Sequence, residues 1–357
     1  MSLADKAPVA SRLQYAMRLA FSLAIGAFGG AVFYMLSLPL PWMLGAMCTV
    51  LTAALMQLPV VSAKRVRPPM AAVIGVMLGS SFNPDMFARI QEWVPVTLAA
   101  VMAMIATGLV GYLYLHYVAK LDPVTSYFGG MSAGIYEMTA QGGMLGGDER
   151  RIALIQATRV FLVVFCVPMV LNLFLHFGST KGLSLQNGAS GYTIRDIAVL
   201  IICGAVGWPL AQKLHLPNPA VIGPMLFSGI VHVSGITSSA PPYILVSAAQ
   251  VVLGTTIGGQ FLGADRRLLL ETAKHSIVLM PLMIAVSALC AWIAVHWSDV
   301  GFAAIFLGLA PGGTAEMSLV ALAIKTDVAL VVFHQMFRQV AIHLLAPGFF
   351  RVIRRRS

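Results

Sequence analysis

The chain has 357 residues, of which 59% are hydrophobic and only 10% are charged, and its formal net charge is +10. Soluble globular proteins carry about 25% charged residues, so this composition excludes a soluble domain and predicts an all-α polytopic membrane protein. The lysines and arginines lie in short loops and at the two ends rather than on one face. We therefore expect them to determine membrane topology, and we predict no nucleic-acid partner.

Apolar segments follow one another along nearly the whole chain. A helix needs about 20 apolar residues to cross the roughly 30 Å hydrocarbon layer. The third segment is a short run, 69–82, that reaches this length only when it is extended through Asn83-Pro84-Asp85 to Ile90. We predict about ten transmembrane helices, at residues 15–36, 42–61, 69–90, 93–118, 152–177, 193–212, 219–235, 242–263, 276–297 and 327–350.

Two further apolar segments, 123–146 and 301–325, are rich in glycine and interrupted, and each carries its single glutamate after the break. Lysine and arginine in short loops stay on the cytoplasmic side, so their positions indicate whether these segments cross the membrane. If both segments cross fully, several basic loops move outside. If each segment enters and leaves on the same side, both termini are cytoplasmic, and the outer loops hold only Arg89, Lys181, Arg195 and Lys325. We therefore predict two re-entrant hairpins.

The second half of the chain repeats the first. Glu316 lies 179 residues after Glu137, and the same offset relates the aspartates, glutamines and arginines that follow. These pairs are Asp148 with Asp327, Gln156 with Gln335, and Arg159 with Arg338. Five crossings and one hairpin in each half would turn the second repeat upside down, the architecture in which transporters bind substrates near the membrane midplane. We predict a first membrane repeat at 1–177, a linker at 178–192 and a second repeat at 193–357.

Arg159 and Arg338 are predicted to lie near the middle of the membrane. Each follows its aspartate, a predicted helix N-cap, by 11 residues, which at 1.5 Å per residue places it about 16 Å along the helix. A charge at that depth is costly unless it is paired or hydrated, and it marks a functional site by default. Two interpretations remain: an ion pair with Glu137 or Glu316, or contact with an anionic substrate group.

The other candidate site residues surround the two breaks. Gln156 and Gln335 lie one helical turn before the arginines and could bind substrate or satisfy free backbone groups of the hairpins. Each glutamate could carry a coupling proton or help to ligate Na⁺. Glycine at a break permits close approach and unusual backbone angles. We assign substrate or ion binding to Glu137, Glu316, Arg159, Arg338, Gln156, Gln335, Gly134, Gly312, Gly313 and Thr314, which we expect to converge on one midplane site.

Two sets of motifs resemble known families. APGGTAEMSLVALAIKTDVALVV and PPMAAVIGVMLGSSFNPDMF resemble transporters of the bile-acid and glutamate sodium symporter and cation/proton antiporter group. More closely, GIYEMTAQGG…DERRIALIQATR and FHQMFRQVAIHLLAP resemble the bacterial membrane AbrB family, which shares its name with a small soluble DNA-binding regulator that this chain cannot be. The sodium symporters tend to carry an asparagine shortly after PGGT, where this chain has Glu316 and Met317, and this departure from their pattern favours H⁺ over Na⁺ coupling.

These observations lead to one main expectation and two alternatives. We expect a secondary active transporter of a small organic anion or zwitterion in the bacterial cytoplasmic membrane, coupled to H⁺ or Na⁺ and without another cofactor. It would form a homodimer within the lipid bilayer. The first alternative is a membrane sensor that influences gene expression. The second, an intramembrane enzyme, is disfavoured because the chain lacks HExxH, GxSxG and any clustered metal set, so we expect no enzymatic activity.

Overall fold

The computed structural model describes residues 9–82, 84, 90–175, 193–216 and 218–354, and every regular element within them is a helix. The first repeat contains α1 (Val9–Met35), α2 (Pro41–Leu55), α3 (Arg67–Gly79), α5 (Trp93–Leu113), α6 (Pro123–Gly130), α7 (Ile135–Met144) and α8 (Glu149–Leu175). The second contains α10 (Ile194–Lys213), α11 (Pro219–Val233), α12 (Tyr243–Gly258), α13 (Arg266–Val295), α14 (Phe302–Leu309), α15 (Thr314–Ala323) and α16 (Val328–Arg354). Three short helical turns, η2 (Ile90–Glu92), η3 (Tyr114–Val118) and η4 (Gly259–Phe261), complete the set. The predicted linker lies outside the described residues.

Seven helices of the described chain are long and apolar enough to cross a membrane, namely α1, α5, α8, α10, α12, α13 and α16. The other three predicted crossings correspond to shorter helices: α2 and α11 have 15 residues each, and α3 has 13. Helix α3 ends at Gly79, and most of its predicted extension to Ile90 lies outside the described residues. The chain is therefore a helical polytopic membrane protein, as its composition predicts.

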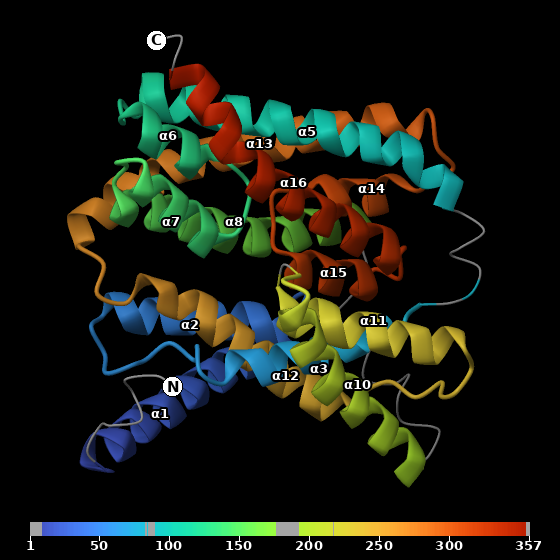
Figure 1. Ribbon diagram of the computed structural model, residues 1–357. Coiled ribbons are helices and arrows are strands. Elements are labelled where there is room, and N and C mark those ends of the chain that lie inside the picture. The colour runs from blue at the N-terminus through green and yellow to red at the C-terminus, as the bar shows by residue number, and fades with distance from the viewer. Residues whose placement is uncertain (1–8, 83, 85–89, 176–192, 217, 355–357) are drawn as a thin grey trace.

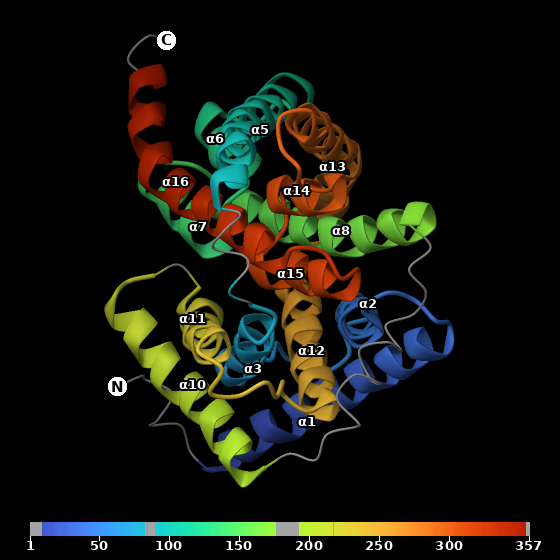
Figure 2. The same ribbon diagram turned by 90° about the vertical axis from the view of Figure 1, so that its right-hand side faces the viewer.

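The helices form two layers (Figures 1 and 2). One, the scaffold layer, contains α1, α2 and α3 with their counterparts α10, α11 and α12. The other, the hairpin layer, contains α5 to α8 with α13 to α16. Each repeat therefore gives its first three helices to one layer and its remaining helices to the other.

The scaffold layer is symmetric down to individual backbone contacts. A Cβ on Gly45 of α2 would meet the carbonyl of Gly29 on α1, and a Cβ on Gly223 of α11 would meet the carbonyl of Gly207 on α10. Close backbone approach of this kind is typical of membrane helix pairs, where small residues replace the hydrophobic effect as the basis of packing. Leu40 and Asn218, which precede α2 and α11, both adopt the left-handed conformation. The two halves of this layer are therefore equivalent.

Both hairpins return to the side from which they enter. The Thr125 hydroxyl near the start of α6 accepts a 2.8 Å hydrogen bond from the backbone N–H of Asp148, just before α8. Side chains of α8 also contact the end of α6, so α6 and α8 run parallel and α7 must bring the chain back. The first hairpin enters from the left-hand side of Figure 1 and the second from the right. The predicted inverted repeats with re-entrant hairpins are confirmed.

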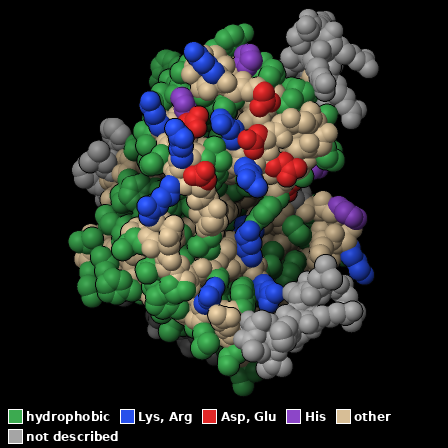
Figure 3. Space-filling view, turned by 90° about the vertical axis from the view of Figure 1, so that its left-hand side faces the viewer, with side chains coloured by type: hydrophobic (Ala, Val, Ile, Leu, Met, Phe, Trp, Pro, Cys, Tyr) green, Lys and Arg blue, Asp and Glu red, His purple; other side chains and the backbone are tan. Residues whose placement is uncertain are grey.

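Lysines and arginines gather on the face shown in Figure 3, which is the left-hand side of Figure 1. Acidic side chains are interspersed among them, and we call this surface the charged face. Helix α1 begins and α16 ends towards the same side (Figure 1). The first hairpin therefore opens onto the charged face and the second onto the opposite one.

Candidate functional site

The two hairpins break at equivalent positions, and each break leaves backbone groups without helical partners. Helices α6 and α14 end at Gly130 and Leu309, and α7 and α15 begin at Ile135 and Thr314. The last carbonyls of a helix and the first N–H groups of the next have no partner within their own helix. Inside a membrane such groups must be satisfied by neighbouring protein groups or by a cavity.

In the first hairpin, two side chains of α8 satisfy the carbonyls. Gln156 donates from Nε2 to the carbonyls of Phe128 and Met131, at 2.7 and 2.9 Å. Arg159 donates from its two terminal nitrogens to the carbonyls of Met131 and Ala133, at 2.6 and 3.1 Å. The guanidinium therefore binds the end of α6, where the helix dipole places partial negative charge.

The second hairpin repeats this arrangement with the equivalent residues of α16. Gln335 donates from Nε2 to the carbonyls of Leu307 and Ala310, at 2.6 and 3.0 Å. Arg338 donates to the carbonyls of Leu309, Ala310 and Gly312, and to Oε1 of Gln335 at 2.6 Å. Of the interpretations open for the glutamines, satisfaction of free backbone groups is the one observed.

In the described part of the chain, the structure does not contain the ion pairs between the arginines and the glutamates that the sequence suggested. Within the described residues, no carboxylate oxygen lies within 4.0 Å of either guanidinium, although Arg159 and Arg338 are only 5% and 4% exposed. The prediction that the arginines pair with Glu137 or Glu316 is wrong. The partners of both guanidinium groups are instead the carbonyl groups that the helix breaks set free.

The glutamates lie instead at the opposite helix ends. Glu137 and Glu316 are in the first turns of α7 and α15, where a negative charge is favourable. Each carboxylate folds back over the residue before its helix, because a Cβ on Gly134 or Gly313 would overlap Oε2 of the corresponding glutamate. A Cβ at either position would have to displace that carboxylate, so glycine there leaves room for the glutamate at the helix start.

Burial separates the two glutamates. Glu316 is 6% exposed, whereas Glu137 is exposed. Among the described residues, neither carboxylate forms an ion pair or a hydrogen bond. Glu316 is therefore much more shielded by protein than Glu137, and a carboxylate within a membrane protein marks a functional site by default, which makes Glu316 the stronger functional candidate.

Three hydroxyl groups near the hairpin tips are buried without a hydrogen bond in the described part of the chain. They belong to Ser132, Thr158 and Thr314. Thr314 is 1% exposed, whereas its counterpart Ile135 is partly exposed, and burial of an unpaired hydroxyl is costly. Sequence reasoning missed Ser132 and Thr158, and only the position of Ser132 beside the glycine-rich break could have indicated it.

The aspartates have the predicted capping role. Oδ1 of Asp148 accepts hydrogen bonds from the backbone N–H groups of Arg150 and Arg151, at 3.0 and 3.1 Å. Oδ1 of Asp327 accepts one from Leu330, at 3.0 Å. Both carboxylates therefore stabilise the starts of the long helices that carry the arginines.

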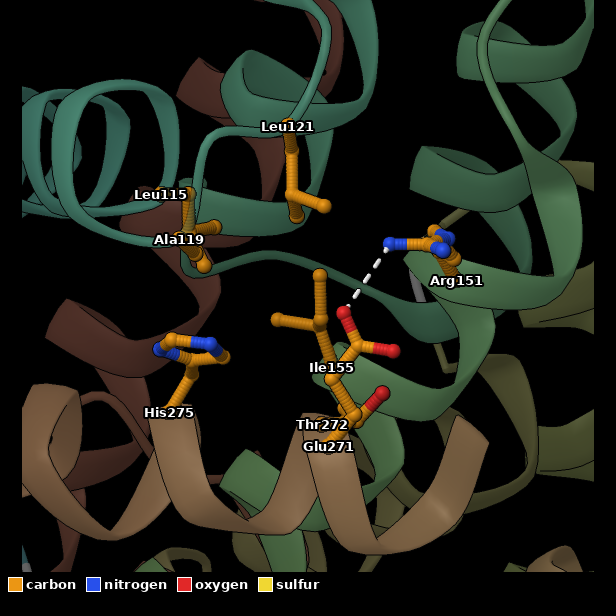
Figure 4. A pocket seen from close by; sticks show the side chains of 8 residues that line it. All are labelled: Leu115, Ala119, Leu121, Arg151, Ile155, Glu271, Thr272 and His275. Atoms are coloured by element: carbon orange, nitrogen blue, oxygen red, sulfur yellow. Dashed lines mark ion pairs between the residues drawn. The ribbon is translucent and has the colours of Figure 1, made fainter. Parts of the chain in front are cut away.

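A small cavity lies away from the hairpin tips, between η3, α8 and α13 (Figure 4). Its lining includes Arg151, Glu271 and His275, and an ion pair of 3.6 Å joins the first two. The cavity volume is about 10 Å³, enough for roughly one water molecule and too small for an organic substrate. This ion pair connects the first repeat to the second and does not form a substrate site.

The fold and the hairpins define a class: a helical polytopic membrane protein whose inverted repeats each carry a broken-helix hairpin. The family model described as "Transition state regulatory protein AbrB" matches residues 42–354. The chain is 27% identical over 360 residues to "Uncharacterized protein YhjN" of Bacillus subtilis (strain 168), covering 93% of this chain and 92% of that protein. It is 24% identical over 291 residues to "Putative regulator AbrB" of Escherichia coli (strain K12), covering 79% of this chain and 81% of that protein.

The matched region covers most of the chain, so the protein belongs to the AbrB family of membrane proteins. The resemblance stated from the sequence motifs is confirmed.

Proposed function

We propose that the protein is a secondary active transporter of a small organic anion or zwitterion, coupled to H⁺ through Glu316. The observation that supports this most is the position of Glu316, which is only 6% exposed and lies at the start of α15, on the tip of a re-entrant hairpin. Inverted repeats with broken helices are the arrangement in which transporters bind anionic groups at helix N-termini and coupling ions nearby.

Proton coupling would arise because the Glu316 carboxylate and a substrate carboxylate compete for the same position at the start of α15. The first N–H groups of α15 favour a negative charge, and no side chain of the described residues caps them by a hydrogen bond. The Glu316 carboxylate folds over this end of the helix. When Glu316 takes up a proton, the helix end loses its internal anion and becomes available to a substrate carboxylate. Proton and anion would then bind together, and the unpartnered Thr314 hydroxyl lies at the same helix end to contact the substrate.

The arginines have a supporting role in this mechanism. Arg159 and Arg338 hold the ends of α6 and α14 against α8 and α16, so that the hairpin tips keep their shape while the glutamate gains and loses its proton. A guanidinium is suited to this because its planar fork reaches several acceptors and it stays protonated. Arginine–substrate contact stays a prediction.

The test is ligand-dependent proton movement in proteoliposomes loaded with a pH-sensitive dye. Pools of amino acids and of small carboxylic acids are first screened for thermal stabilisation of the purified protein. Compounds that stabilise it are then added outside, with the membrane potential set by potassium and valinomycin. We expect internal acidification that accompanies substrate uptake and falls as the external pH rises. Binding without net flux of either species would contradict a transporter.

A membrane sensor that affects gene expression is the second candidate. Its support is the name of the Escherichia coli relative and the description of the family. This candidate predicts the outcome that contradicts the first one, which is ligand binding without flux.

A further inference from the structure

The two hairpins have the same sequence pattern and the same helix bounds but unequal exposure. In α15, every residue from Thr314 to Ala321 is buried. In α7, only Met138 and Gly142 are buried. The contrast is sharpest at the second residue of each helix, because Tyr136 is 58% exposed whereas its counterpart Ala315 is 2% exposed.

Contact with the scaffold layer accounts for this difference. Helix α15 packs on α3 of the scaffold as well as on α8 and α16. Helix α7 packs on α6, α8 and α16, all within its own layer, and has no comparable packing on the scaffold among the described residues. The symmetric counterpart of the α15–α3 contact would join α7 to α12.

The scaffold does not cause the asymmetry, because its two halves make equivalent contacts. A Cβ on Gly75 of α3 would meet the carbonyl of Val221 on α11, and a Cβ on Gly254 of α12 would meet that of Met43 on α2. The difference therefore lies in where the hairpin layer sits on a symmetric scaffold. Exchange of the environments of the two hairpins would give a second arrangement, in which α7 is covered and α15 is uncovered.

The exposed end of α7 faces a basic loop. Nζ of Lys64, in the loop between α2 and α3, lies 5.8 Å from the centre of the Tyr136 ring, and Arg65 stacks on Tyr15 of α1. The first hairpin also opens onto the charged face, where lysines and arginines gather (Figures 1 and 3). Positive charge along an approach raises the local concentration of anions and their rate of association.

We propose that anionic substrate reaches the hairpin tips from the charged face along α7, past Lys64 and Tyr136, and that α7 and α15 are uncovered alternately. The described conformation is the one with α7 uncovered and α15 closed against α3. This inference rests on the proposed function and assigns its access route.

Sided thiol labelling tests the proposal on the full chain. Tyr136→Cys and Ala315→Cys are introduced separately after the four native cysteines are replaced, and a membrane-impermeant thiol reagent is applied to vesicles of known orientation. Without substrate, we expect Y136C to react from the side of the charged face and A315C not to react from either side. With a compound that thermally stabilises the purified protein, and with a proton gradient, A315C should react from the opposite side and Y136C should lose reactivity.

Controls address sidedness and folding. Met144→Cys and Lys325→Cys, at the exposed bases of the two hairpins, report reagent access from the two faces. Ser318→Cys, a near-isosteric change at a second buried position of α15, replaces A315C if that variant does not fold.

The outcomes separate this proposal from the proposed function. If flux is measured but Y136C is unreactive from both sides, α7 faces lipid and the access route is wrong. If flux is measured and both α15 positions stay unreactive with substrate, the alternation is wrong. Labelling as expected without flux would support the two arrangements and contradict transport.

A matched charge series tests the basic loop. Lys64→Gln removes the positive charge and Lys64→Glu reverses it, outside the hairpins themselves. We expect the KM for an anionic substrate to rise from wild type to Gln to Glu, with the differences lost at high salt because screening removes the steering. Equal KM values for all three proteins would contradict a role for Lys64.

Discussion

The two hairpins show which properties follow from local sequence and which follow from position in the molecule. In both, a glutamine and an arginine satisfy the carbonyls of the broken helix, and a glutamate folds over the start of the next one. Yet α15 of the second hairpin is buried, whereas most of its counterpart α7 in the first is not. The internal hydrogen bonds are therefore common to both environments, whereas exposure depends on which hairpin rests on the scaffold. This separation suits a moving part whose shape must persist while its surroundings change.

The largest expected effect is a fall in unfolding temperature when either arginine is replaced by alanine, and the fall should be greater for Arg338 than for Arg159. Arg338→Ala would leave the buried carbonyl of Gly312 without a donor and would remove one of the donors of Leu309 and Ala310, and each unsatisfied group costs about 1–3 kcal/mol. Arg159 binds fewer acceptors in a more exposed hairpin, so Arg159→Ala should lower the unfolding temperature less. Thermal unfolding in detergent measures both.

Arg338→Lys is the matched control, because it keeps the charge but loses the planar fork. We expect its stability and transport to lie between those of wild type and Arg338→Ala. If Lys fully restores both, the charge alone matters and the carbonyl contacts do not explain the buried arginine.

The next effect concerns the two glutamates. Glu316→Gln keeps the shape of the side chain but cannot exchange a proton, so flux should lose its dependence on external pH while the protein stays folded. Glu137→Gln should retain the dependence, since this carboxylate is already exposed in the described conformation. Dye-loaded proteoliposomes report both variants. Normal pH dependence in Glu316→Gln would exclude this residue as the coupling site.

Much of the fold could be predicted because charge and hydropathy are strongly patterned. Sparse charges made the 179-residue repeat visible, and the placement of basic loops distinguished re-entrant from crossing segments. The lengths of α2, α3 and α11 were predicted less well, since apolar loop residues extend the hydropathy signal beyond the helix ends.

The sequence identified the residues of the candidate site but not the contacts that they make. Sequence placed Arg159 and Arg338 at depth and the glutamates beyond the breaks. It could not show that backbone carbonyls are the partners of the arginines, because carbonyls carry no sequence signal. The unequal burial of Glu137 and Glu316 was equally hidden, since it arises from packing between layers and not from either repeat alone.

The smallest expected effect on stability is that of Thr314→Val, and it is the most informative about the tip of the second hairpin. Valine nearly matches threonine in shape, and the Thr314 hydroxyl forms no hydrogen bond within the described chain, so stability should change by less than about 1 kcal/mol. If the hydroxyl contacts substrate, flux should nevertheless fall and the KM should rise. Ser318→Ala is the matched control: its hydroxyl donates to the Thr314 carbonyl within α15 at 2.6 Å, so its loss should leave flux unchanged. Normal flux in both variants would mean that Thr314 does not contact the substrate, and the polar residue at this buried position would then need another cause.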